Sequence, residues 1–368
     1  QSFQINGAPI SEELFAKRFF EVWNKLPEKS SEDLDVPRYL QLLALLSFHV
    51  FISEGVDVAI YETHLGGEYD ATNIVMNPIA TAVTTIAEDH AHLLGPTIEN
   101  IAWHKSGIFK QGAPAFSSPQ TTSVEKVLRE RALERNTTLE IITPNQMLEK
   151  MTVPGMPKVQ KTNCSLALAL VSTYIEANIN SVRQSISTAE LLASCPDPIW
   201  PGRFQHIEKD GLQLYIDGAH NASGVSHAIE WFAERISRLH EYVSESDFLS
   251  SAIHNPTRIL IFSHFSRRNV DDLLRCVAYH LKKNDILVHH VIFTSYNTGR
   301  DDINSNERNL QKRYNPNVLE GCRSTWEVFE ERSTISICDT IAQALRKAGE
   351  LASNACGAEV LVLGSLHL

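Results

Sequence analysis

The spacing of apolar residues in the first half of the chain alternates between helix and strand patterns. Helical spacing predicts helices over 14–26, 38–52 and 123–135, from about Thr97, and from Asn163 to about Ile179. Short apolar runs predict strands over 56–62, 79–87 and 138–143. The segment 38–52, RYLQLLALLSFHVFI, is apolar on most faces, which is typical of a buried helix. Strands that alternate with helices predict a mainly parallel sheet with helices on both faces.

A second α/β series follows a proline-rich segment. Residues 194–203, SCPDPIWPGR, contain three prolines and no periodicity, which indicates a domain boundary. We expect a first domain over 1–195, a linker over 196–205 and a second domain over 206–368. Strands of the second domain are expected near 212–217, 258–263, 287–293, 334–338 and 358–363. The predicted fold class is therefore α/β with two domains.

The composition narrows the classes of protein to which the chain can belong. Its 368 residues are 43% hydrophobic and 21% charged, as in ordinary globular proteins. The net charge of −11 argues against a dedicated nucleic-acid surface, which is usually basic. No apolar run approaches the ~20 residues needed to cross a bilayer, so we expect neither a nucleic-acid nor a membrane partner. The six cysteines form no CxxC pair, which indicates reduced thiols rather than a zinc site or a disulfide scaffold.

Polar residues crowd the end of the predicted strand 56–62. Glu62 would stand at its carboxyl end, where open α/β sheets bind ligands. Gly66 and Gly67 let the backbone turn tightly or approach a ligand closely. Asp70 can cap the next segment. Two interpretations remain, a ligand site at a strand end and an ordinary Asx-rich turn.

Asp89 and His90 follow the predicted strand 79–87, so they should lie on the same rim as Glu62. A carboxylate with a neutral imidazole can hold a divalent metal ion, although Mg²⁺ normally prefers oxygen ligands. The alternative is a surface histidine at a strand end, and the nearby His92 supports that alternative.

Lys105 shares a helix face with apolar residues. Thr97 is a natural N-cap for this helix and Gly107 a natural stop. Helical spacing puts four residues on the shared face, namely Ile98, Ile101, Ala102 and Lys105. An unpaired buried ammonium group is costly. Lys105 therefore either extends to solvent or has an anionic partner, a lowered pKa or a covalent modification.

The segment 212–232 combines a strand, a glycine turn and the start of a helix. Apolar residues alternate along the strand, Asp217 stands at its end and Gly218 allows a sharp turn. The N–H groups at such a helix start are available for phosphate. Asp217 could hold a metal-bound water or a substrate group, and His220 could contact phosphate or transfer a proton. The alternative is a turn in which Asp217 only caps the helix.

Two further polar residues have one functional and one structural interpretation each. Arg203 follows Trp200, Pro201 and Gly202 at the predicted domain junction, where it could bind phosphate or a nucleotide base. A salt bridge between the domains is the alternative. Asn163, at the predicted start of a buried helix, could contact a ligand or cap the helix.

Seven segments, in order along nearly the whole chain, resemble the folylpolyglutamate synthases of the Mur-type ligase superfamily. They are INGAPISEELF, YETHLGGEYDATNIV, DHAHLLGPTIENIAWHKSGIFK, QKTNCSLALAL, WPGRFQ, IDGAHNASG and LVLGSLHL. THLGGEYDATN and IAWHK look most similar to fungal members. The resemblance implies a Mur-ligase-like central ATPase domain with a mostly parallel sheet and a Rossmann-like C-terminal domain.

The resemblance also implies an activity and a set of site residues. Such enzymes use ATP to phosphorylate a carboxylate, here the γ-carboxylate of a folate or of its glutamate tail. The amine of glutamate then displaces phosphate. By resemblance, Mg²⁺ would be bound by Glu62, His90 and a carbamylated Lys105. Contacts with ATP would come from Asn163, Arg203, Asp217 and His220. The implied catalytic residues are His90, Lys105, Asp217 and His220.

The phosphate loop of the family, of the G-x-x-G-K-[ST] type, is expected before residue 1. No Gly-Lys-Ser or Gly-Lys-Thr occurs in the 368 residues, and this puts ATP and Mg²⁺ binding in question. One interpretation is a ligase whose N-terminal segment is not in the sequence, which Gln1 in place of a start methionine favours. The other is a homologue without the loop, as a pseudoenzyme, a binding protein or an enzyme repurposed for a reaction without ATP.

The expected partners are therefore small molecules, folate and glutamate. We expect a monomer in the cytoplasm, with the mitochondrion as a second candidate compartment.

Overall fold

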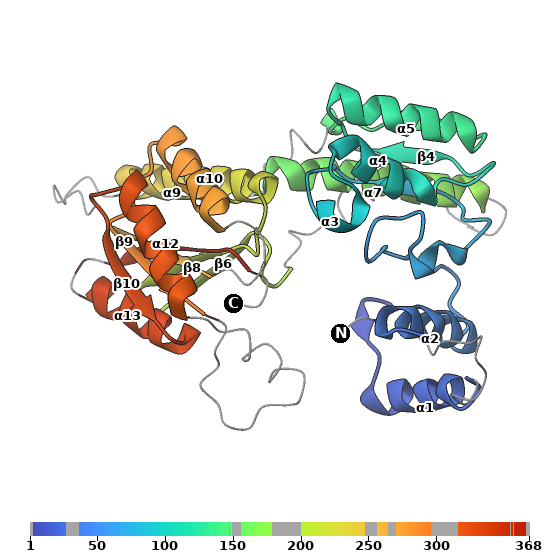
Figure 1. Cartoon of the computed structure of the whole chain (residues 1–368), viewed down its shortest axis with the longest axis horizontal. Coiled ribbons are helices and arrows are strands. Elements are labelled where there is room, and N and C mark those ends of the chain that lie inside the picture. Colours follow the sequence, from blue (N-terminus) through green and yellow to red (C-terminus); the bar gives the residue numbers. More distant parts are fainter. Residues whose placement is uncertain are drawn as a thin grey trace. The chain divides into compact units, whose positions relative to one another are not determined.

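The computed structural model of the chain contains two compact units, each with its own helices and strands (Figure 1). The first unit comprises 1–143 and 166–185, and the second comprises 144–165 and 186–368. The structure describes residues 3–26, 37–146, 148, 156–178, 200–246, 256–263, 270–295, 316–353, 355 and 357–365.

The first unit begins with a small hairpin and two helices. Strand β1 (Gln4–Ile5) pairs antiparallel with β2 (Ala8–Pro9), and helices α1 (Glu12–Trp23) and α2 (Tyr39–Ser53) follow. The residues buried between them are Phe3, Leu43, Leu46 and Val50. Both predicted helices are confirmed, with ends that differ from the predicted ends by a few residues. The buried positions of α2 explain part of the apolar character of 38–52. Four other apolar side chains of this helix are exposed, namely Tyr39, Leu40, Leu45 and Ile52.

A three-stranded parallel sheet forms the next part of the first unit. Its order is β3 (Thr81–Val83), β4 (Ala115–Ser117) and β5 (Leu139–Ile141). The other elements are α3 (Ala91–Leu94), α4 (Ile98–Lys105), α5 (Thr122–Glu134), η1 (Ala71–Ile74) and η2 (Ser106–Ile108). Helices α4 and α5 pack on the sheet through Val83, Ile101, Phe109, Ala115 and Leu128. The strands predicted near 79–87 and 138–143 are confirmed. Strand β4 was not predicted, because three residues are too few to show an alternation of apolar positions.

The strand predicted over 56–62 is wrong. These residues form neither helix nor strand, and Ile60 is 88% exposed. A strand persists where a neighbouring strand accepts and donates its backbone hydrogen bonds. Within the described ranges this segment has no such neighbour. Alternation of apolar residues is therefore not sufficient here.

Helix α7 (Lys158–Ala177) confirms the long Ala/Leu-rich helix but begins before Asn163. Asn163 lies in the second turn of α7, so the capping role suggested for it is wrong. Polar residues in the first turns hid the true start, because Lys158, Gln160 and Lys161 give no apolar periodicity.

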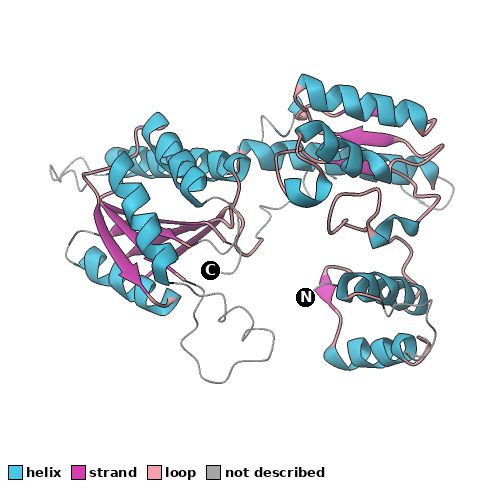
Figure 2. Cartoon of the chain, viewed as in Figure 1, coloured by secondary structure: helices cyan, strands magenta, loops and turns pink. Residues whose placement is uncertain are grey.

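The second unit is a six-stranded sheet covered by helices (Figure 2). Its strands are β6 (Gln205–Lys209), β7 (Leu212–Ile216), β8 (Thr257–Phe262), β9 (His290–Thr294), β10 (Thr334–Cys338) and β11 (Ala358–Leu363). The order is β10-β9-β8-β11-β7-β6, with every pair parallel except β6 and β7. All five predicted strands are confirmed. The antiparallel edge strand β6 was missed because QHIEK shows no clear apolar alternation.

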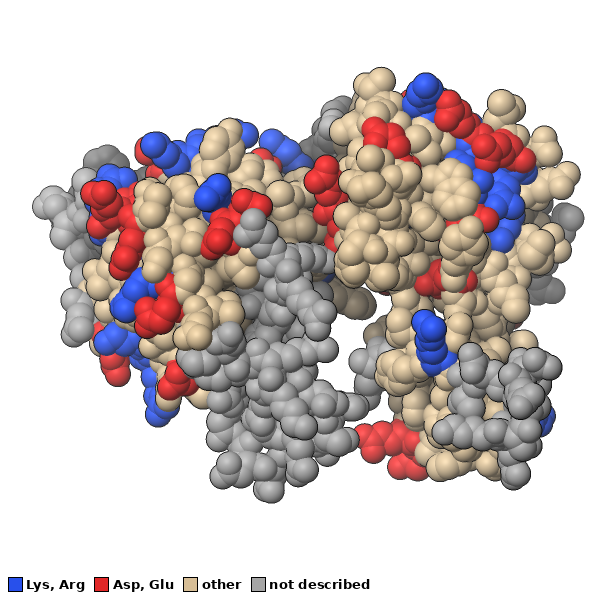
Figure 3. All heavy atoms as spheres, in the orientation of Figure 1, with Lys and Arg blue, Asp and Glu red and all other residues tan. Residues whose placement is uncertain are grey.

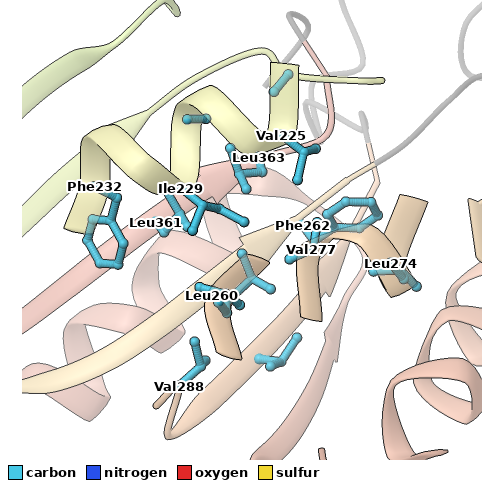
Figure 4. Close-up of a cluster of buried hydrophobic side chains, with 14 of the residues drawn as sticks. Val225, Ile229, Phe232, Leu260, Phe262, Leu274, Val277, Val288, Leu361 and Leu363 are labelled. Carbon is cyan, nitrogen blue, oxygen red and sulfur yellow. The ribbon is translucent and has the colours of Figure 1, made fainter. Parts of the chain in front are cut away.

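Helices cover both faces of this sheet. They are α9 (Ala222–Ser246), α10 (Val270–Lys283), α12 (Pro316–Phe329) and α13 (Ile341–Ser353). Buried residues of α9, α10 and α12 form one core with the sheet, including Val225, Ile229, Phe232, Leu260, Leu274 and Leu361 (Figure 4). Helix α13 packs Ala344, Ala348 and Ala352 against the opposite face. The central strands β8 and β11 are nearly continuous apolar runs because both of their faces are buried.

The predicted α/β class is confirmed in both units, and the predicted domain limits stay a prediction. Residues 196–199 of the predicted linker lie outside the described residues. On the face seen in Figure 3, acidic and basic side chains are interspersed. No helix in the described part of the chain is long and apolar enough to cross a membrane. Cys276, Cys322 and Cys338 are free thiols, and of these three Cys322 is buried.

Candidate active site

Asp70 organises the loop 61–73. Its Oδ2 accepts hydrogen bonds from the backbone N–H groups of His64 and Leu65, at 2.9 and 3.0 Å. Its Oδ1 accepts from the N–H and the hydroxyl of Thr72, at 2.9 and 2.7 Å. Burial by itself would raise the pKa of Asp70, but these hydrogen bonds together lower it below its usual value. Asp70 therefore stays ionised, shapes the loop and caps η1 as predicted.

The two glycines of the loop bring its backbone onto the end of α4. Gly66 has a left-handed φ of 68°. A Cβ atom on Gly67 would lie 2.7 Å from the carbonyl oxygens of both His104 and Lys105. The next residue, Glu68, donates its N–H to the carbonyl oxygen of His104 at 2.8 Å. The predicted tight turn is present at Gly66, and Gly67 approaches the backbone beside Lys105. A close approach to a ligand stays a prediction.

Glu62 stands at the start of this loop with an exposed side chain. No hydrogen bond or ion pair of its carboxylate occurs among the described residues. Because the segment before it is not a strand, Glu62 does not mark a strand end. Its exposed carboxylate is nevertheless accessible to a cation.

His90 and Asp89 lie together at the entry to α3. The His90 Nε2 is 3.5 Å from the Asp89 Oδ1, and 42% of the His90 side chain is exposed. The His90 backbone is left-handed, with φ of 54°, a conformation that histidine adopts more readily than most side chains. The His92 ring centroid is 6.3 Å from that of His90. The expected pairing of an acid with an imidazole is therefore present at this turn.

Lys105 is the last residue of α4. Ile101 and Ala102 on the same face are buried, which confirms the predicted apolar face, while Lys105 itself is only half-buried. Within the described ranges no carboxylate pairs with its amine. The ammonium group is thus at the edge of the core, where it can reach water. This agrees with the alternative that Lys105 extends to solvent.

The donor set of the first unit can be compared with the needs of Mg²⁺. No three His, Cys, Asp or Glu side chains cluster closely enough, in the part of the chain that the structure describes, to hold a metal ion alone. Mg²⁺ usually keeps several waters and binds one or two carboxylates together with substrate phosphates. The Glu62 carboxylate fits this pattern, whereas the imidazole of His90 suits Mg²⁺ less well. The role of His90 as a metal ligand stays a prediction.

Asp217, in the second unit, is 4% exposed and follows strand β7 directly. Its Oδ2 accepts the N–H of Phe204 at 2.9 Å, and its Oδ1 is 3.7 Å from the Arg203 Nη1. Burial raises the pKa of Asp217, and the Phe204 N–H, the Arg203 guanidinium and the Ala219 N–H offset only part of this rise. A buried carboxylate with a raised pKa at the carboxyl edge of a sheet is typical of a functional position.

The turn after Asp217 orients His220 and starts α9. His220 Nδ1 donates to the carbonyl oxygen of Gly218 at 3.0 Å, which places the lone pair of the neutral ring on Nε2. Asn221 Oδ1 accepts the N–H of Gly224 at 2.9 Å and so caps α9. The interpretation of Asp217 as the helix cap is therefore wrong, because the adjacent Asn221 performs that role.

The seven predicted site residues are divided between the two units. Glu62, His90 and Lys105 belong to the first unit, and Asn163, Arg203, Asp217 and His220 belong to the second. Arg203, Asp217 and His220 form one cluster, since Arg203 and His220 both lie close enough to Asp217 to act on its pKa. The salt bridge of Arg203 therefore lies within one unit and not between two. Convergence of the two groups on one ligand stays a prediction.

Several important residues of these segments were missed from sequence. Phe204, which contributes only its backbone N–H to Asp217, carries no sequence signal at all. Glu68 binds Arg131 and Arg135, which lie more than sixty positions away in the sequence. Asn221 could have been found, because asparagine directly before a helix is a strong capping signal.

Comparison with known proteins places the whole chain in one family, although no family model matches the sequence. The folylpolyglutamate synthase of Neurospora crassa is 33% identical over 393 residues, covering 100% of this chain and 71% of that protein. The probable folylpolyglutamate synthase of Schizosaccharomyces pombe is 35% identical over 387 residues, covering 100% of this chain and 72% of that protein.

A solved structure shares the fold over almost the same extent. Mycobacterium tuberculosis folylpolyglutamate synthase complexed with ADP and AMPPCP has a TM-score of 0.74 and 20% identity, and the match covers 99% of this chain and 79% of that chain. The two-unit α/β architecture is therefore shared with a folylpolyglutamate synthase. Because the fungal proteins are 33% and 35% identical along the whole chain, the chain belongs to the folylpolyglutamate synthase family.

Proposed function

We propose that the protein is an ATP-dependent ligase that adds glutamate to the γ-carboxylate of a folate or a folylpolyglutamate. ATP transfers its γ-phosphoryl group to the carboxylate, and ADP leaves. The amine of glutamate then attacks the acyl phosphate, an amide bond forms and phosphate is released. The observation that carries this proposal is the alignment of the entire chain with relatives named folylpolyglutamate synthase.

In this proposal the cluster around Asp217 belongs to the nucleotide site. The Arg203 guanidinium can donate to phosphate oxygens, and its contact with Asp217 limits the orientations that it can adopt. The His220 ring is held by Gly218 and can contact phosphate through its other edge. Asn163 would be a further nucleotide contact. The complex of the M. tuberculosis protein with ADP and AMPPCP supports a nucleotide ligand for this fold.

In the first unit, Glu62, His90 and Lys105 are the proposed residues for Mg²⁺. When bound, Mg²⁺ would offset the negative charge of the phosphate groups. Glu62 contributes an exposed carboxylate, and a carbamylated Lys105 would contribute a second one. The half-buried position of Lys105 leaves its amine accessible for that modification.

A glutamate-incorporation assay tests the proposal. The protein is incubated with labelled glutamate, a reduced folate and Mg-ATP, and the folate product and ADP are measured. We expect label in the folate only when ATP is present, with ADP formed in proportion. Asp217→Asn should lose this activity, while Leu345→Ala on the exposed side of α13 should keep it. Folded protein that binds Mg-ATP but incorporates no glutamate would refute the ligase assignment.

A second candidate is a family member that binds a small molecule without ATP turnover. This candidate stays a prediction. Calorimetry separates the two candidates, since this one predicts folate binding without a measurable response to Mg-ATP. The monomeric state and the cytoplasmic or mitochondrial location stay predictions.

A further inference from the structure

The carboxylate of Glu68 is held by two arginines, Arg131 in the last turn of α5 and Arg135 at its C-cap. Its Oε2 accepts a hydrogen bond from Arg131 Nη2, and both of its oxygens accept from Arg135 Nη2, at 2.8 and 3.0 Å. The Glu68 side chain is 17% exposed and the Arg131 side chain 7%. Charge-assisted contacts of this kind are roughly twice as strong as neutral ones, so the pairing is a firm link between the loop and α5.

Besides Glu68, Arg131 contacts Trp103 and Glu134. Its guanidinium carbon lies 4.4 Å from the ring centroid of Trp103 on α4, in cation–π geometry. Its Nη1 donates to Glu134 at 2.7 Å, and Glu134 is 57% exposed. Within the described ranges its buried Nε has no hydrogen-bond partner. Because a buried guanidinium needs a counter-charge, loss of Glu68 would leave Arg131 with only its exposed partner.

The backbone of Glu68 is attached to the other side of the same junction. Its N–H donates to the carbonyl oxygen of His104, one residue before Lys105. The Asn73 amide donates both to the Glu68 carbonyl oxygen and to the Gly107 carbonyl oxygen, each at 3.1 Å. A Cβ on Gly107 would lie 2.4 Å from the Glu68 Cα. Glu68 thus packs directly on the chain on both sides of Lys105.

These contacts sort the three carboxylates of the loop. Asp70 is used by the backbone of the loop, and both oxygens of Glu68 are used by arginines. Of the three, Glu62 is the carboxylate that has no partner among the described residues. Glu68 could therefore bind a metal ion only if it lost its contacts with the arginines.

We propose that Glu68 is a positioning residue, which joins α5 to the loop 61–73 and so fixes Lys105 relative to that loop. The proposal rests on the proposed function only for its effect on catalysis. Its structural content, that the Glu68 carboxylate controls the surroundings of Lys105, holds for any ligand of this site.

Two single variants test the proposal with the same change of charge. Glu68→Gln removes the charge that faces Arg131 and Arg135, whereas Glu134→Gln removes a charge from Arg131 on its exposed side. Hydrogen exchange of the Glu68 amide should rise about tenfold in Glu68→Gln, the equivalent of one charge-assisted hydrogen bond. The acetylation rate of Lys105, measured by mass spectrometry relative to the 76% exposed Lys126, should change in the same variant. Neither quantity should change in Glu134→Gln.

Arg135→Gln provides a second test if Glu68→Gln is poorly folded. Arg135 is 37% exposed, so its substitution is a mild change, and Lys105 reactivity should change in this variant while it stays unchanged in Glu134→Gln. Where Glu68→Gln folds, the double variant should show less than the sum of the two single effects on Lys105 reactivity. For a ligase, Glu68→Gln should lower kcat more than it changes the KM of glutamate. Equal exchange and equal Lys105 reactivity in both single variants would overturn the proposal. Altered reactivity without any ligase activity would keep it and refute the proposed function instead.

Discussion

One added methyl group at Gly67 tests how closely the loop 61–73 must approach α4. The Gly67 backbone is not left-handed, so alanine can adopt its conformation without backbone strain. The added Cβ of Gly67→Ala would instead meet the carbonyl oxygens of His104 and Lys105 at 2.7 Å, and both oxygens belong to rigid backbone. The substitution thus separates the effect of close packing from that of glycine's conformational freedom.

The magnitude follows from the distance. A carbon atom normally stays about 3.3 Å from a carbonyl oxygen, so the loop must move away by roughly 0.6 Å from its 2.7 Å position. Overpacking of this size costs about 1–3 kcal/mol. The hydrogen bond from the Glu68 N–H to His104 would also be strained, at about 1 kcal/mol. Alanine also lowers the conformational entropy of the unfolded chain, which stabilises the folded state by about 0.4–1 kcal/mol. We expect a net loss of about 1–3.5 kcal/mol.

Urea unfolding combined with hydrogen exchange measures this loss and locates it in the first unit. The matched control is Gly321→Ala on the exposed side of α12, where an added Cβ meets no atom within 4 Å. That variant should gain about 0.5–1 kcal/mol because alanine favours the helix. The reasoning is refuted if Gly67→Ala is as stable as the original protein and the two variants behave alike.

Three further predictions concern the second unit. Burial raises the pKa of Asp217, so its carboxyl favours folding below the ordinary pKa of about 3.9 and loses that contribution as pH rises through the raised value. Asp217→Asn should therefore gain stability relative to the original protein as pH rises from 3 to 7, by urea unfolding at each pH, although activity is lost. Leu260→Ala, at a fully buried position of β8, should cost about 2–5 kcal/mol in thermal unfolding, whereas Leu345→Ala should cost little. Asn221→Ala should cost about 1 kcal/mol through loss of the α9 cap, and Asn221→Ser should restore most of it.

The sequence predicted most of the second unit because its strands are long and buried. Strands β8 (TRILIF) and β11 (AEVLVL) are six residues long and mostly apolar, and the amphipathic helices between them have a clear period. The parallel sheet of the first unit has strands of only three residues, and β4 was not predicted. In that unit the prediction of a strand over 56–62 failed, because the backbone hydrogen bonds of a strand depend on a neighbour that the local pattern does not reveal.

Some candidate site residues could likewise be predicted from the sequence, whereas others could not. Asp217 and His220 could be identified from sequence because a strand end, a glycine turn and a helix start follow each other within a few positions. The true cap of α9 and the Phe204 N–H that binds Asp217 emerged only from the folded chain. Local order in the sequence thus indicated where a polar site lies but not which group fills each role.

The sequence by itself determined the α/β class, the elements with a strong period and the identity of the polar residues at their ends. The tertiary structure decided which carboxylates of 61–73 have hydrogen-bond donors as partners and which one is exposed. Asp70 binds its own loop, Glu68 binds arginines 63 and 67 positions away, and Glu62 stays exposed. The physical reason is that the role of a carboxylate depends on the donors that folding brings within about 3 Å of it, and those donors come from distant parts of the chain.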